Sequence, residues 1–522
     1  MAESSPDALR RPLSCEWLDT TLRDGEQTAG VSFNASEKLA IAQLLLEELK
    51  IDRIEVASAR VSQGESEGFA RICGWASSRG LLERIEVLGF IDGGVSVDWI
   101  AAGGGKVVNL LAKGSLNHLT NQLRKTPAEH IADISAVVEY AAKKGLQANI
   151  YLEDWSRGIA DSPDYVFTLV DALQGLPIRR FMLPDTLGVL DPWTTAAYIG
   201  QMKARYPDLH FDFHGHNDYG LAVANTLSAV RAGCAGIHVT VNGLGERSGN
   251  TPVAPVAAGL RDMLGVRSGV EESKLTHVSK YIESISGIRI PENAPIVGEN
   301  VFTQTSGVHA DGDRKGDLYA NRLLPQRFGR ERTYALGKMS GKANIVENLD
   351  KLGINLSPDQ VRLVTQRVVE LGDKKEMITM EDLPFIVADV LKSSALQDNI
   401  RIVNYSLQLT KDMKPAAMLK LSIDGTEYET SSNGDGQYHA FMRALWKIYD
   451  RLGKPHPLLS DYQVSIPPGG KTDALVATTI IWDMNGHTIK TRGIDSDQTA
   501  AAIKATVKML NMVENLDITT LK

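Results

Sequence analysis

Two histidines separated by one residue stand in the segment HFDFHGH, residues 210–216. If this segment is a strand, its side chains alternate between two faces, and Asp212, His214 and His216 share one of them. Two imidazoles side by side on a strand are suited to bind one divalent metal ion. A pair of hydrogen-bonded histidines is the alternative interpretation.

Two oxygen-bearing side chains are candidates to complete such a metal site. Asp24 lies in DTTLRDGEQ, and Asn250 closes NGLGERSGN. Carboxylate, imidazole and amide-oxygen ligands leave room for substrate and water, and they suit Zn, Mn or Mg. Taken alone, Asp24 is equally typical of a helix N-cap or a surface ion pair, and Asn250 is more typical of a turn.

Three further side chains have chemistry that such a site would use. Glu153, in YLEDW, is expected to hold Arg23 by a charge pair, and an arginine fixed beside a metal-bound carbonyl stabilises a developing oxyanion. The alternative is a plain ion pair. Thr186, in PDT, is a candidate to bind a substrate carboxylate or to cap a loop. His309 stands in the polar run HADGDRKGDLYAN, where composition alone favours a surface histidine.

A regular alternation of strands and helices, running to about residue 265, must position these residues. The candidate strands are 15–21, 53–58, 84–90, 107–112, 147–153, 180–184, 210–216 and 236–242. Helical patterns follow at 35–49, 66–78, 128–144, 163–173, 193–205, 221–232 and 252–264, and the stretch near 97–102 is the weakest. This count and length predict an α/β fold, a closed (β/α)8 TIM barrel. An open doubly wound sheet is the alternative, which the lack of a GxGxxG after the first strand disfavours.

Closure of the barrel would bring the candidate ligands together. Strands 7, 8 and 1 are neighbours in a closed eight-stranded barrel, and the catalytic face lies at the carboxyl ends of its strands. We therefore expect Asp24, His214, His216 and Asn250 to converge on one sector of the rim.

The chain continues well beyond a barrel, which we assign to residues 1–270. For residues 271–395, the sequence pattern predicts small, mostly helical linker or lid subdomains without a second compact core. Residues 396–522 contain a weak repeat, in which 419–448 and 475–510 each predict two strands, a polar turn and a helix. Each half is too small to bury its own face, so the two are expected to pack as one α+β regulatory domain. A passive dimerisation domain is the alternative.

Composition excludes several classes of protein. The 522 residues carry a net charge of −8, which argues against a nucleic-acid module or a polybasic membrane binder. Three widely spaced cysteines predict buried thiols in a reducing compartment. No apolar stretch approaches the length of a membrane span, and no signal peptide is visible, so we expect a cytoplasmic protein.

The segments LDTTLRDGEQ, HGHND and NGLGERSGN together resemble the isopropylmalate/homocitrate/citramalate synthase family over nearly the whole chain. The resemblance implies a metal-dependent Claisen condensation of acetyl-CoA with a 2-oxo acid. The metal ligands that it implies are those named above, with Asn250 the weakest, and Arg23 with Glu153 as the polarising pair. It further implies that His309 transfers a proton, in a homodimer to the site of the other subunit, and that Tyr319 is a weaker candidate.

The resemblance also indicates a pocket and a regulatory site. Leu88, Leu111 and Tyr151 would line the pocket as bulky apolar groups, which favours pyruvate over 2-oxoisovalerate. The C-terminal domain would sense isoleucine, or leucine in an isopropylmalate synthase, with Tyr438 and Asp473 as loosely placed contacts.

Two other functions remain open on the sequence. A metal-dependent barrel aldolase or lyase would share the metal site but lack the C-terminal repeat, and a carboxyltransferase would need a lysine that residues 180–185 do not contain. A metal-containing structural or amino-acid-binding protein would not need Arg23, Glu153 and His309 together.

Overall fold

The computed structural model describes residues 14–316, 318–373, 378–391, 399–465, 476–484 and 486–515. The chain divides into two compact units, Met1–Phe302 with Ala320–Arg332, and Thr303–Tyr319 with Thr333–Lys522. Within the described residues, no helix is both long and apolar enough to cross a membrane.

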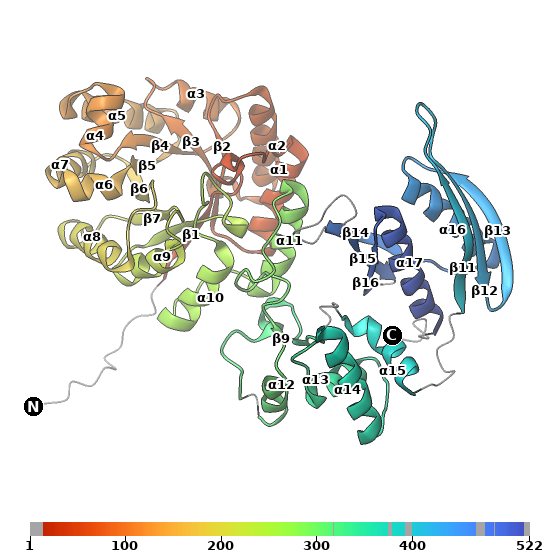
Figure 1. Ribbon diagram of the computed structural model, residues 1–522. Coiled ribbons are helices and arrows are strands. Elements are labelled where there is room, and N and C mark those ends of the chain that lie inside the picture. Colours follow the sequence, from red (N-terminus) through yellow and green to blue (C-terminus); the bar gives the residue numbers. More distant parts are fainter. Residues whose placement is uncertain are drawn as a thin grey trace, which may run out of the picture. The chain divides into compact units, whose positions relative to one another are not determined.

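The first unit is built on a closed barrel of eight parallel strands (red to light green in Figure 1). The strands are β1 (Glu16–Asp19), β2 (Arg53–Ser58), β3 (Ile85–Phe90), β4 (Val107–Lys113), β5 (Gln147–Glu153), β6 (Ile178–Asp185), β7 (Phe211–Gly215) and β8 (Gly236–Val239). Strand β1 pairs in parallel with both β2 and β8, which closes the sheet. The predicted barrel is confirmed, and the open-sheet alternative is wrong.

Helices surround the barrel in the expected order. They are α1 (Ala35–Gln43), α2 (Gln63–Arg79), α3 (Val95–Ala102), α4 (Leu116–His118), α5 (Pro127–Lys143), α6 (Trp155–Asp161), α7 (Pro163–Leu173), α8 (Pro192–Arg205), α9 (Ala222–Arg231), α10 (Val253–Leu264) and α11 (Leu275–Ser286). The helix expected over residues 35–49 changes to a π turn over Leu44–Glu48. The short helix α6, directly after β5, was not expected.

The two faces of β7 have the environments that alternation predicts. Phe211 and Phe213 are completely buried in the apolar layer between the strands and the helices. Asp212 points the other way, since its carboxylate meets Arg53 of β2 at 2.6 Å across the barrel interior. The face that carries Asp212, His214 and His216 therefore lines the inside of the barrel.

The second unit begins with a helical region that has its own small core. It contains β9 (Thr303–Gln304), α12 (Gly307–Arg314), β10 (Thr333–Tyr334), α13 (Lys342–Lys351), α14 (Pro358–Asp373) and α15 (Leu383–Leu391). Ile345, Leu349, Val364 and Leu383 are buried together in an apolar cluster. The expectation that this region lacks a compact core is wrong, because apolar residues at helical spacing on three helices bury one another.

The C-terminal module is a repeat of three strands and a helix. The first half is β11 (Ile400–Gln408), β12 (Ala416–Ile423), β13 (Thr426–Asn433) and α16 (Gln437–Leu452), and the second is β14 (Leu458–Ser465), β15 (Val476–Met484), β16 (His487–Asp495) and α17 (Gln498–Asn515). Each half forms a three-stranded antiparallel sheet, and side chains of both halves share one core. The predicted packing of two halves is confirmed, but β11 and β14 were missed because they are largely exposed.

Candidate metal and substrate site

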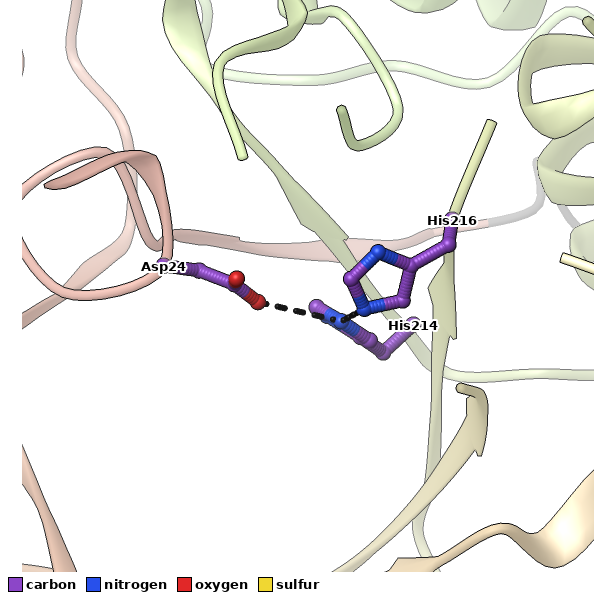
Figure 2. Close-up of side chains that lie close together, drawn as sticks. All are labelled: Asp24, His214 and His216. Atoms are coloured by element: carbon purple, nitrogen blue, oxygen red, sulfur yellow. Dashed lines mark hydrogen bonds and ion pairs between the residues drawn. The ribbon is translucent and has the colours of Figure 1, made fainter. Parts of the chain in front are cut away.

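Three of the predicted ligands meet at the carboxyl ends of β1 and β7. Asp24 Oδ2 lies 3.3 Å from His214 Nε2, which in turn lies 3.3 Å from His216 Nε2 (Figure 2). One ligand atom from each of the three residues falls within 4.8 Å of the others, and all three side chains are buried. Period-two alternation on β7 places both imidazoles on the inner face, and β1 ends beside them.

The protonation states of this cluster suit a metal. Burial lowers the pKa of His214 and brings that of His216 to about 4, so both imidazoles are neutral near pH 7. Burial alone would raise the pKa of Asp24, but Arg23 and His214 hold that pKa well below its usual range. A carboxylate and two neutral imidazoles are the forms that ligate a divalent cation.

Two buried oxygen atoms at the site also fit a cation. Asp24 Oδ1 and Asn250 Oδ1 have no hydrogen-bond partner among the described residues. Asn250 donates its Nδ2 to the Leu244 carbonyl at 3.0 Å, which leaves its oxygen free, and it forms a β-bridge with His216. Since a buried acceptor without a partner is costly, a metal ion would supply the partner that these two oxygen atoms lack. The role of Asn250 as a ligand stays a prediction.

The expected pair between Arg23 and Glu153 is wrong. Arg23 Nε donates to Glu55 Oε2 at 2.6 Å, and Arg23 Nη1 lies 3.2 Å from Asp24 Oδ2. Glu153 instead forms an ion pair with Lys113 at the end of β4. Arg23 follows β1, and the inward Glu55 of the adjacent β2 reaches its Nε. Arg23 Nη2 also reaches Tyr151 of β5, but Glu153, at the end of that strand, pairs with Lys113 of the adjacent β4.

Glu55 and Lys113 are therefore site residues that the sequence reasoning missed. Glu55 interrupts an otherwise largely apolar strand, and Lys113 follows the apolar run VVNLLA. A charged residue in a strand that is buried on both faces is the signal that indicates them.

A pocket of about 210 Å³ opens beside the metal cluster, below the roughly 300–1,000 Å³ of typical ligand sites. Its lining includes every barrel residue predicted to bind substrate, together with Arg23 and Glu153. These substrate candidates are Leu88, Leu111, Tyr151 and Thr186. The two leucines and the Tyr151 ring belong to a small apolar cluster with Leu18 and Met182.

Tyr151 is not the simple apolar wall that was expected. Its hydroxyl oxygen accepts from Arg23 Nη2 at 3.4 Å and lies 3.3 Å from Glu55 Oε2 and 3.2 Å from His238 Nδ1. Only the ring of Tyr151 faces the pocket as apolar surface, because its hydroxyl belongs to a polar network inside the barrel.

The turn after β6 carries Thr186, whose hydroxyl accepts the Asp154 amide at 2.9 Å. This is the loop-capping role, and it leaves the hydroxyl hydrogen to donate toward the pocket, which Thr186 also lines. Arg247, a pocket residue that was not predicted, donates to the Thr186 carbonyl at 2.7 Å and pairs with Asp218 at 2.8 Å. It thereby joins the turns after β6, β7 and β8.

Lys38 of α1 contacts the loop that carries Arg23 and Asp24. The side chain is almost fully buried, and Nζ lies 2.6 Å from Glu26 Oε2 and forms a second ion pair with Glu65 of α2. Lys38 also approaches the Leu22 carbonyl at 3.5 Å. A buried lysine between two glutamates was not expected from the sequence.

The remaining predicted residues belong to the second unit. His309 is exposed on α12, its Nδ1 lies 3.1 Å from Gln304 Oε1, and its ring stands 4.2 Å from that of Tyr319. Tyr438 of α16 bonds its hydroxyl to Thr506 Oγ1 of α17 at 2.7 Å. Asp473 lies outside the described residues.

Three family models match successive parts of the chain. Residues 14–282 match the HMGL-like model, residues 296–376 the homocitrate synthase post-HMGL domain-like model, and residues 377–514 the LeuA allosteric (dimerisation) domain.

Curated relatives match over almost their whole length. A protein of Methanopyrus kandleri named "Putative (R)-citramalate synthase CimA" is 35% identical over 477 residues, 91% of each chain. The (R)-citramalate synthase CimA of Methanocaldococcus jannaschii is 33% identical over 95% of this chain and 99% of its own. A second M. kandleri protein, "Probable 2-isopropylmalate synthase", is 33% identical over 95% of this chain and 97% of its own.

Proposed function

The chain belongs to the family of HMGL-like synthases with a LeuA allosteric domain, and from this premise we propose that it condenses acetyl-CoA with pyruvate to give (R)-citramalate and CoA. The observation that carries the proposal is the small pocket in which Asp24, His214 and His216 adjoin Arg23 and two leucines. An acyltransferase of this kind needs an electrophilic ketone held beside a nucleophile.

The barrel residues supply the binding and polarisation of the 2-oxo acid. Asp24, His214 and His216, with Asn250 as a fourth candidate, would hold a divalent Zn, Mn or Mg ion, which as a Lewis acid would polarise the ketone and orient the substrate. The Thr186 hydroxyl donates to the substrate carboxylate. Arg23 donates to the ketone oxygen as it gains negative charge.

Carbon–carbon bond formation needs a proton to leave the acetyl methyl group. We assign this proton transfer to His309, supported by Tyr319, on the strength of the GVHADGD motif and the close packing of the two rings. The enolate carbon then bonds to the ketone carbon, the ketone oxygen becomes the alcohol, and water hydrolyses the thioester to release CoA.

Pyruvate is preferred because of the size of the pocket wall. Leu88 and Leu111, together with the Tyr151 ring, face the position where the substituent of the 2-oxo acid would lie. They accommodate a methyl group and crowd an isopropyl group. Since one or two methylenes are worth only about 1–3 kcal/mol in an apolar pocket, strong selection requires such occlusion.

The C-terminal module would provide regulation and association. The LeuA allosteric (dimerisation) domain over residues 377–514 supports a homodimer and feedback inhibition by a branched-chain amino acid, which we propose is isoleucine. Tyr438 connects α16 to α17, so an effector that moves these helices would disturb its hydroxyl contact.

A thiol-release assay tests the proposal. The purified chain, freed of metal and reloaded with Mn²⁺, is supplied with acetyl-CoA and either pyruvate or 2-oxoisovalerate. Pyruvate should give the higher kcat/KM, and chelator should abolish the signal. A preference for 2-oxoisovalerate would indicate a 2-isopropylmalate synthase. That activity is the alternative because a relative named "Probable 2-isopropylmalate synthase" is 33% identical to this chain. No CoA release with either acid would refute the synthase assignment.

A further inference from the structure

A polar network inside the barrel lies next to the proposed site and has no role in it so far. Asp212 shares the inner face of β7 with His214, His216 follows directly after the strand, and His238 projects from β8. His238 Nε2 lies 3.2 Å from Asp212 Oδ2, and Nδ1 lies 3.2 Å from the Tyr151 hydroxyl. Asp212 and His238 are at most 1% exposed, and Tyr151 is 3% exposed.

Asp212 determines which nitrogen of a neutral His238 carries the hydrogen. Arg53 Nη2 lies 2.6 Å from Asp212 Oδ2, so the carboxylate forms a buried ion pair with a guanidinium that is always charged. An ionised carboxylate only accepts hydrogen bonds, so Nε2 of His238 carries the hydrogen and Nδ1 becomes an acceptor. The fold makes room for this carboxylate, because a Cβ on Gly236 would stand 2.0 Å from Asp212 Oδ1.

The Tyr151 hydroxyl then has one hydrogen and two acceptors nearby. His238 Nδ1 lies at 3.2 Å and Glu55 Oε2 at 3.3 Å. When the hydrogen is donated to His238, Glu55 Oε2 is not shared between the hydroxyl and Arg23 Nε, which lies 2.6 Å from it, and the hydroxyl oxygen can accept from Arg23 Nη2 at 3.4 Å. Both acceptors then hold the same guanidinium.

We propose that His238, oriented by Asp212, is a positioning residue that turns the Tyr151 hydroxyl so that Tyr151 and Glu55 together hold Arg23 at the pocket. The inference rests on the proposed function, in which Arg23 stabilises the charge that develops on the ketone oxygen. His238 acts through Tyr151 and touches no substrate.

A double-mutant cycle with His238→Leu and Tyr151→Phe in the full-length protein tests this chain of contacts. Each single change should lower kcat/KM for pyruvate about tenfold or more. The double variant should be no worse than Tyr151→Phe by more than about twofold, because without the hydroxyl His238 has nothing to turn. His238→Gln, which keeps a donor and an acceptor, should retain more activity than His238→Leu.

Two measurements separate positioning from general damage. His210→Leu is the matched control, since His210 bonds the other oxygen of Asp212 at 2.8 Å and no bond to Tyr151 is described for it. It should leave kcat/KM within about twofold and show no coupling to Tyr151→Phe. The Kd for Mn²⁺ should be unchanged in His238→Leu, although the rings of His238 and His214 lie 5.3 Å apart.

Several results would overturn the inference while leaving the synthase assignment intact. One such result is an active wild type together with an unchanged kcat/KM in His238→Leu. Another is a loss of kcat/KM in the double variant that equals the product of the losses in the two single variants. A higher Kd for Mn²⁺ in His238→Leu would mean that His238 acts on the metal ligand His214 instead. If circular dichroism shows that His238→Leu does not fold, the same cycle is run with His238→Phe, which keeps an aromatic ring and removes both nitrogens. A wild type that releases no CoA refutes the proposed function itself.

Discussion

Acidification should destabilise the barrel through His130, a histidine of α5 that supports Lys113. His130 is 1% exposed, and its Nε2 accepts the Lys113 amide at 3.1 Å. Burial, and then the positive charge of Lys125, lower its pKa from 6.5 to about 4. The folded protein therefore keeps this imidazole neutral at pH values where the unfolded chain protonates it.

The sign and size of the effect follow from linkage. Between about pH 6.5 and pH 4 the unfolded state binds a proton at His130 that the folded state does not, so the stability present at higher pH is lost as the pH falls. With about 1.36 kcal/mol for each pH unit, the drop from pH 7 to pH 5 costs about 2 kcal/mol of unfolding free energy from this group alone.

Equilibrium urea unfolding at the two pH values measures this loss. Other groups also titrate, so the informative quantity is the difference between the wild type and His130→Gln, which retains an acceptor for the Lys113 amide. The variant should lose about 2 kcal/mol less than the wild type between pH 7 and pH 5. His277→Gln, at an exposed histidine of α11, is the matched control. Equal losses in the wild type and His130→Gln would show that His130 does not resist protonation in the fold.

Three other predictions concern the pocket and its supports. Leu88→Ala should raise kcat/KM for 2-oxoisovalerate relative to pyruvate by about tenfold or more in the thiol-release assay. Val87→Ala is the control, because Val87 faces the helices, and it should leave the ratio unchanged. An unchanged ratio in Leu88→Ala would refute the assignment of Leu88 to the pocket wall. Lys38→Met should lower the free energy of unfolding in urea by about 3 kcal/mol and weaken Mn²⁺ binding, because two carboxylates lose their buried partner. Lys144→Met, which removes an exposed ion pair, is the control. Equal effects of the two changes would refute the role of burial. Lys113→Met should lower kcat/KM more than Lys113→Arg does, and equal rates would show that the ion pair with Glu153 has no part in catalysis.

Periodicity in the sequence was enough to locate the barrel and its metal cluster. Strands β2 and β5 have the predicted bounds because each is a short run between clear helical patterns. Alternation along β7 placed both histidines on one face, and closure of the barrel brought Asp24 beside them. These features depend on local spacing and on one topological rule, and both can be read from a single chain.

The partners of the charged side chains depend on information that local spacing does not contain. Arg23 had several carboxylates within reach of a hypothetical barrel, and it meets Glu55 of the adjacent β2, whereas Glu153 pairs with Lys113 of the adjacent β4. The Tyr151 hydroxyl of β5 likewise meets His238 of β8, which is not a neighbouring strand, because both side chains project into the closed interior. A sequence pattern predicts which side chains point inward, whereas strand order, stagger and side-chain length decide which of them meet. Charged and hydroxyl-bearing residues in strands buried on both faces are therefore the positions where such contacts should be sought first.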